Sequence, residues 1–132
     1  MLLVASGGLL IGVALHGIDH VLQARGIGAL TTEVRLGGLA NGVLAVIVFA
    51  LALRDHPRAP AVAAFVGAYL VVGVSAAHFA PHWSAFSDPY ADLDLPFVSW
   101  AAAAAEVATA AVLAAVGLAV LRQRRVAEVA PG

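Results

Sequence analysis

The chain has 132 residues, of which 62% are hydrophobic and only 11% are charged, and its net charge at pH 7 is −1. A soluble domain has roughly half apolar residues, so this composition, with a mean hydropathy of +0.96, indicates an integral membrane protein. The near-zero charge excludes nucleic acid as a partner, because nucleic-acid binding needs a basic surface. The absence of cysteine excludes disulfides, iron–sulfur clusters and thiolate metal sites.

Four apolar runs dominate the sequence, and each is close to the ~20 residues that cross a bilayer core. We therefore predict an all-α fold: a polytopic membrane protein in which four transmembrane helices form an up-down-up-down bundle within one domain over 1–132. Pro60 suits the first turn of a helix, and Pro81 favours a helix end just before it. The helices are expected at about 2–21, 36–53, 60–80 and 97–121.

The first run is interpreted as a retained helix rather than a cleaved signal peptide. No positive residue precedes Leu2, and no clear small-x-small cleavage site follows the run. Residues 22–36 are then a polar connection to the second helix. Gly8 and Gly12 have the spacing that lets a neighbouring helix approach closely.

Arginine positions predict the orientation in the membrane. Five arginines fall on the side of the termini and of the turn near His56, and two fall on the other side. The positive-inside rule then places both termini in the cytoplasm, with the protein in the plasma (inner) membrane. The expected partner is the lipid bilayer, and the Ala/Gly-rich surfaces suit a homo-oligomer or a larger membrane complex. The five arginines on the side of the termini are Arg54, Arg58, Arg122, Arg124 and Arg125, and the two on the other side are Arg25 and Arg35.

The stretch from His16 to His20 carries the strongest functional signal. His16, Asp19 and His20 fall at positions i, i+3 and i+4, so they share one face of a helix. Three ionisable side chains on one face of a membrane helix are costly unless they are paired, hydrated or bound to a ligand. This stretch is therefore interpreted as part of a site.

Polar residues of the other helices are predicted to reach the same depth. At 1.5 Å per residue, Asn41, His78 and Glu106 all fall in the outer half of the bundle, as His16 and His20 do. Helices 1 and 3 run parallel in such a bundle and lie diagonally, so their polar faces can meet at its centre. His56 is assigned no role, and His82, which follows Pro81, is expected in a loop, where solvation is favoured over a ligand role that the sequence leaves open.

The leading interpretation is a transition-metal site. Two histidines at i and i+4 can chelate one ion, and His78 and Glu106 can complete the coordination. Asp19 is expected to orient a histidine or to act as a ligand, and with Glu106 it is the candidate catalytic residue. Imidazole and carboxylate ligands suit Zn, Cu or Fe, and the sequence does not choose among them. The predicted activity is redox or hydrolytic chemistry on a lipophilic or periplasmic substrate.

Three alternatives remain open at this point. A haem b with two axial histidines from helices 1 and 3 would make the protein an electron-transfer subunit. A proton-coupled small transporter would use Glu106 as its proton carrier. A non-catalytic accessory subunit of a larger membrane complex would need none of these polar residues. Whether the protein is an enzyme is left undecided by the sequence.

Overall fold

The computed structural model describes residues 1–26 and 31–129, and within them the chain forms four α-helices, one short 3₁₀ helix and no strand. The predicted all-α bundle is confirmed. All four α-helices contain segments long and apolar enough to cross a membrane. The helices are α1 (Leu2–Gly26), α2 (Thr32–Leu53), α3 (Ala59–His78) and α4 (Phe97–Val129), with η1 (Tyr90–Asp92) between α3 and α4.

Three helices extend beyond the limits that the apolar runs predict. α1 continues to Gly26, and α2 begins at Thr32, where the Thr31 side chain accepts a hydrogen bond from the Val34 N–H at 3.2 Å. α4 continues through its arginine-rich end to Val129. Hydropathy marks where a helix leaves the apolar layer, whereas polar helix formers such as Arg and Gln let it continue. Part of the predicted connection over 22–36, residues 27–30, lies outside the described residues.

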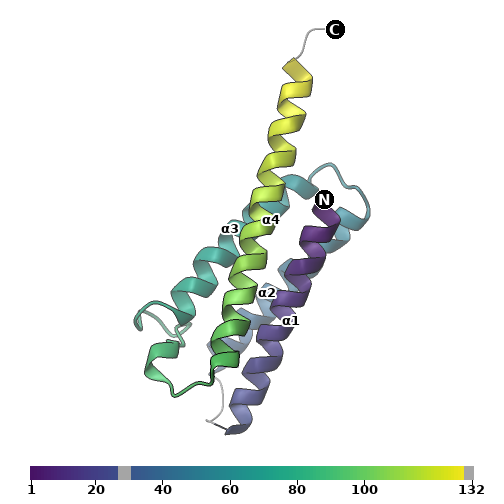
Figure 1. Cartoon of the computed structure of the whole chain (residues 1–132). Coiled ribbons are helices and arrows are strands. Elements are labelled where there is room, and N and C mark those ends of the chain that lie inside the picture. Colours follow the sequence, from purple (N-terminus) through teal and green to yellow (C-terminus); the bar gives the residue numbers. More distant parts are fainter. Residues whose placement is uncertain (27–30, 130–132) are drawn as a thin grey trace.

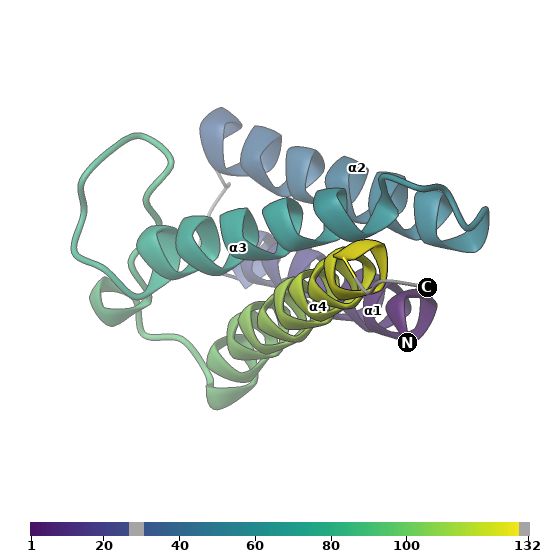
Figure 2. The ribbon, with the colours of Figure 1, turned by 90° about the horizontal axis from the view of Figure 1, so that it is seen from above.

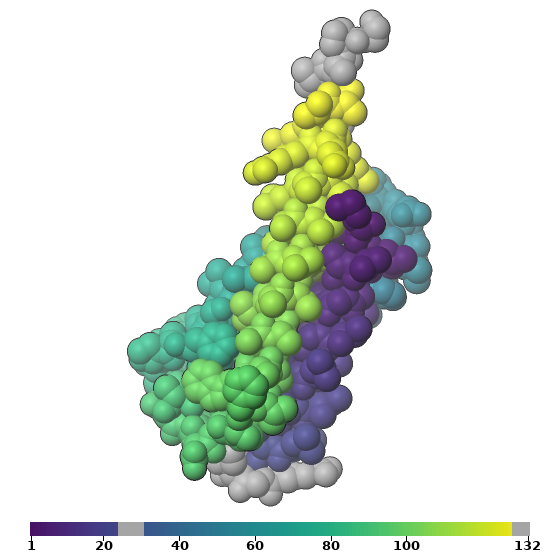
Figure 3. Space-filling model, in the orientation of Figure 1, coloured from purple at the N-terminus to yellow at the C-terminus, as the bar shows by residue number. Residues whose placement is uncertain are grey.

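The helices alternate in direction, so the start of α1 and the end of α4 lie at one end of the bundle (Figure 1). We call this the termini end, and the opposite end, which carries residues 79–96, the loop end. α4 packs against both α3 and α1, while α2 packs against α1 and less extensively against α3. Figure 2 shows α3 between α2 and α4, and Figure 3 shows α4 alongside α1, with its last turns beyond the other helices.

Two glycines set the close approach of α3 and α4. A Cβ atom on Gly67 would lie 2.6 Å from the Ala110 oxygen, and one on Gly117 would lie 2.6 Å from the Ala64 nitrogen. Both distances are too short for any side chain, so the backbones of α3 and α4 touch there. Gly12 has the same role between α1 and α4, because its Cβ would lie 3.1 Å from the Glu106 Cα.

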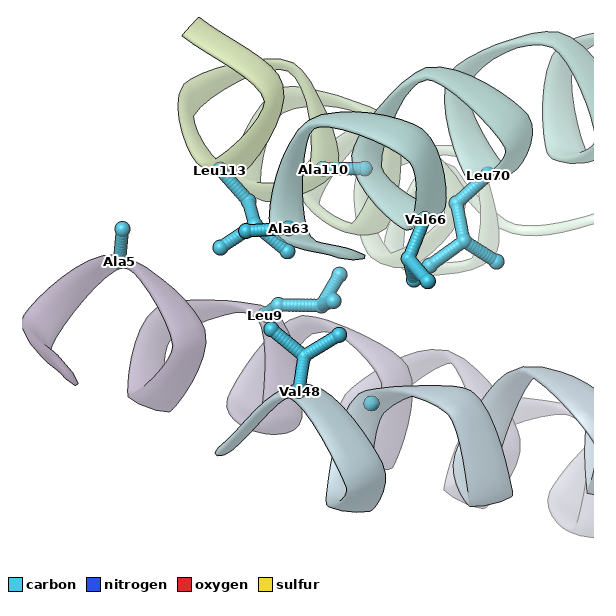
Figure 4. Close-up of a cluster of buried hydrophobic side chains, with 9 residues drawn as sticks. Ala5, Leu9, Val48, Ala63, Val66, Leu70, Ala110 and Leu113 are labelled. Carbon is cyan, nitrogen blue, oxygen red and sulfur yellow. The ribbon is translucent and has the colours of Figure 1, made fainter. Parts of the chain in front are cut away.

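The apolar core gathers side chains from all four helices (Figure 4). Leu9 of α1 and Val48 of α2 meet Leu70 of α3 and Leu113 of α4, and each of these four side chains is fully buried. In the loop half the interior is polar instead, with His16, His78 and Glu106 buried. The bundle therefore divides into an apolar half and a half that holds polar groups.

Candidate metal centre

Three histidines from α1 and α3 meet inside the loop half of the bundle. His16, His20 and His78 each offer one ring nitrogen, and these nitrogens lie within 4.8 Å of one another. The ring centroids are 4.6 Å apart for His16 and His20, 4.8 Å for His16 and His78, and 5.2 Å for His20 and His78. We call this group the histidine cluster. Three nitrogens around one tetrahedral zinc ion lie about 3.3 Å apart, so small side-chain shifts would let all three bind the same ion.

Glu106 of α4 holds His16 in place. Its Oε2 lies 2.5 Å from His16 Nδ1, and its Oε1 accepts a hydrogen bond from the Asn41 side-chain amide of α2 at 3.3 Å. Glu106 is only 2% exposed. With both oxygens engaged, the carboxylate links α4 to α1 and α2, and it accepts the Nδ1–H of His16.

Tyr90 of η1 reaches the histidine cluster from the segment between α3 and α4. Its side chain is fully buried, and its hydroxyl lies 3.0 Å from His16 Nε2. Burial raises the pKa of the Tyr90 phenol, which stays protonated. In the neutral His16 ring that donates its Nδ1–H to Glu106, the lone pair is on Nε2, where it accepts the Tyr90 O–H.

Asp88 orients His78 through the main chain. The Asp88 carbonyl oxygen accepts the Nδ1–H of His78 at 3.1 Å, and the Asp88 N–H donates to the Ala77 oxygen at 2.9 Å. These two bonds tie the segment after α3 back onto the last turn of that helix. They also leave His78 Nε2 with a free lone pair, the form in which imidazole binds metals.

His20 and the Asp88 carboxylate form an incompletely paired contact. His20 Nδ1 and Asp88 Oδ2 lie 4.0 Å apart, and both atoms are buried without a hydrogen-bond partner among the described residues. Burial raises the pKa of the Asp88 carboxyl. Buried polar atoms are nearly always satisfied, so this contact marks a position where a water or an ion is expected.

Asp19 lies beside the histidine cluster, but its hydrogen bonds are to residues outside the cluster. Its carboxylate accepts from the Gln23 side chain, one turn further along α1, and from the Ser99 hydroxyl of α4 at 2.9 Å. Asp19 and Ser99 are both buried. These bonds join α1 to α4, and the predicted catalytic role of Asp19 stays a prediction.

A cavity of about 670 Å³ adjoins the histidine cluster. Its walls come from the first half of α2, from α1, and from the second half of α3, and they are mostly apolar. His16, His20, His78 and Glu106 form a polar patch on this lining. The cavity is within the size range of small-molecule sites.

The sequence located the residues that the helices contribute on their predicted polar faces, but it missed Tyr90 and Asp88. The structure brings His16, His20, His78 and Glu106 together, while His82 is exposed and outside the cluster. Tyr90 is fully buried against His16. Tyr90 and Asp88 belong to a segment without periodicity, so no sequence signal shows that it folds back over the histidines.

Comparison with known proteins assigns no family: no protein-family model, no curated protein and no solved structure matches the chain. The class of protein is therefore defined by the fold and the site alone. The chain is a four-helix membrane protein with three buried, adjacent histidines that can hold a metal ion.

Proposed function

We propose that this membrane protein binds one transition-metal ion through ring nitrogens of His16, His20 and His78. The observation that carries the proposal is the convergence of three imidazoles, from two helices, within 4.8 Å of one another. One pair comes from successive turns of α1, and the third histidine ends α3. Clustering imidazoles inside an apolar bundle is unfavourable unless they gain a partner, and a shared cation provides one.

The hydrogen bonds around the histidine cluster support this proposal. Histidines that bind metals usually donate their other N–H to a carboxylate or a backbone carbonyl, which fixes the tautomer and the ring orientation. His16 meets the Glu106 carboxylate in this way, and His78 meets the Asp88 carbonyl. In both rings the nitrogen left over is Nε2. Tyr90 occupies that lone pair on His16, and a bound ion would take the place of its O–H.

Three histidine ligands favour a reactive site over a purely structural one. Structural zinc sites close with four protein ligands, whereas catalytic sites keep three and leave one position for water or substrate. The adjoining cavity of about 670 Å³ offers space for such a molecule. We propose Lewis-acid activation of an oxygen atom at the open position. Zn, Cu and Fe all suit imidazole ligands, and redox chemistry stays a prediction.

The alternatives fit the geometry less well. A haem with two axial histidines needs its macrocycle between two imidazoles whose centroids are then roughly 6 Å apart. The three rings are closer than that, at 4.6–5.2 Å, which favours one shared ion. Glu106 has hydrogen-bond partners on both oxygens, which supports an orienting role. Transport and accessory-subunit roles stay predictions.

Metal binding by matched histidine variants tests the proposal. The detergent-purified protein should retain about one Zn, Cu or Fe ion per chain after dialysis, measured by elemental analysis, and should show no Soret band. His16→Ala, His20→Ala and His78→Ala should each lose most of the bound metal. His56→Ala and His82→Ala are the controls, because both side chains are exposed, and they should match the unmodified protein. Equal metal content in all five variants would overturn the proposal.

A further inference from the structure

The cavity beside the histidine cluster has the features of a binding site for one class of molecule. We propose that it binds an amphiphilic substrate, with a long apolar body along α2 and a single oxygen head group at the metal ion. This inference rests on the proposed metal site, and it specifies the substrate class of that site.

The distribution of polar groups in the cavity supports an amphiphile. Histidines and Glu106 form one polar patch, and Glu33 and Arg35 lie in the first turn of α2, at the loop end. Between these groups the lining consists largely of Val, Leu, Ala and Gly residues, among them Val13, Leu36 and Val74. A hydrophilic substrate would leave most of its polar groups unpaired against such walls, whereas an apolar body would not.

Glycines keep the cavity open. Gly17, Gly38 and Gly73 all line it, and a Cβ atom on any of them would meet nothing within 4 Å. Glycine destabilises a helix interior by about 1 kcal/mol relative to alanine, and no neighbouring helix occupies the space that these three leave. Gly67 and Gly117 differ, because there the facing helix fills the space. The glycines of the cavity therefore leave room for something other than protein.

The shape of the cavity indicates how the molecule would lie. Lining residues of α2 run from Glu33 to Asn41, a rise of about 12 Å along the helix. Asn41 also hydrogen-bonds Glu106, so the deep part of the cavity lies beside the polar patch. An ion held by three histidines has one position left for a donor atom. A single hydroxyl or carboxylate oxygen at the end of a long chain satisfies that requirement.

The test uses the protein loaded with Co²⁺, whose visible absorption responds to a new ligand on the metal. Two carboxylates serve as probes: acetate, which is only a head group, and dodecanoate, which adds a long chain. Gly38→Leu, Gly73→Leu and the double variant place side chains in the cavity. Gly42→Leu is the matched control, because Gly42 also has open space around it but does not line the cavity.

We expect both probes to change the spectrum of the unmodified protein and of the control. The double variant should bind the long probe about tenfold more weakly or worse, while its affinity for acetate stays the same. Unchanged affinity for the long probe in the double variant, or no binding of that probe to the unmodified protein, would overturn the inference. Failure of the unmodified protein to bind Co²⁺ would overturn the metal site instead. The single variants decide the question if the double variant does not fold.

Discussion

At the scale of single residues, Glu106 has the clearest expected effect. Its Oε2 accepts from His16 Nδ1 at 2.5 Å, so Nε2 is the His16 nitrogen that would bind an ion. Glu106→Gln keeps the size of the side chain but replaces one carboxylate oxygen with an NH₂ group, which removes the negative charge. We expect metal affinity to fall by about 10–100-fold, measured by competition with a chelator, while Tm of the metal-free protein changes little. Unchanged affinity would show that Glu106 only packs against His16.

Asp19 should behave differently, although it lies on the same helix face as His16. Its carboxylate bonds Gln23 and Ser99 and thereby joins α1 to α4. Asp19→Asn cannot accept from both donors in the same way, so we expect a loss of about 1 kcal/mol in the free energy of unfolding. Metal affinity should stay within about twofold, because this variant removes no hydrogen bond of the histidine cluster.

Ser99→Ala is the control for that prediction, because it removes one of the two donors to Asp19. It should lower the free energy of unfolding by a similar amount, measured as a fall in Tm. A large loss of metal affinity in Asp19→Asn, with Tm unchanged, would instead place Asp19 in the metal site, as the spacing within the first helix suggests.

The sequence is informative about these residues only where helical periodicity applies. Depth along regular helices predicted that His16, His78 and Glu106 would meet, because 1.5 Å per residue holds over each span. Tyr90 and Asp88 follow no such rule. Their positions depend on how residues 79–96 close over the bundle, through contacts such as Asp88 N–H to the Ala77 oxygen, and no local pattern encodes those contacts.

At the scale of helices, the contact between α3 and α4 depends on Gly67 and Gly117. A Cβ atom at either position would lie 2.6 Å from backbone atoms of the facing helix. We expect Gly67→Ala and Gly117→Ala each to lower the free energy of unfolding by about 1–3 kcal/mol, despite the better helix propensity of alanine. Thermal unfolding in detergent measures the effect.

Gly42→Ala is the matched control, because a Cβ atom there meets nothing within 4 Å. It should leave Tm unchanged or raise it slightly. Destabilisation of equal size in all three variants would mean that close α3–α4 packing is not what these glycines provide.

Helix number and order were predictable from hydropathy, whereas helix ends were not. α2 begins four residues before the expected position 36 because Thr31 caps it through the Val34 N–H. The capping bond satisfies a free N–H group, an effect that hydropathy does not detect. The same holds for α4, whose arginine-rich last turns stay helical after the apolar segment ends.

At the scale of the whole molecule, the orientation in the membrane remains a proposal that rests on the arginine distribution. The chain has no cysteine, so single-cysteine variants need no further substitution. Ala85 is exposed at the loop end and Gln123 is exposed near the end of α4. We expect Ala85→Cys to react with an impermeant maleimide in intact cells, and Gln123→Cys to react only after lysis. The reverse labelling pattern would place the histidine cluster near the cytoplasmic face.

The interior of the bundle divides into an apolar core and a group of buried polar side chains. Leu9, Val48, Leu70 and Leu113 fill the termini half, and close-packed apolar side chains there provide van der Waals contacts between all four helices. The loop half contains the histidine cluster and the cavity, where the helices are less closely packed by apolar side chains. Stability and metal binding should therefore respond to different substitutions.

X-ray absorption spectroscopy of the metal-loaded protein tests the central claim most directly. We predict one ion per chain with a nitrogen shell at about 2.0–2.1 Å and the multiple-scattering signal of three imidazoles. His78→Ala should remove one imidazole from that shell, and His82→Ala should leave the spectrum unchanged. A spectrum without imidazole scattering, or one that is identical in His78→Ala, would contradict the assignment of the histidine cluster as a metal site.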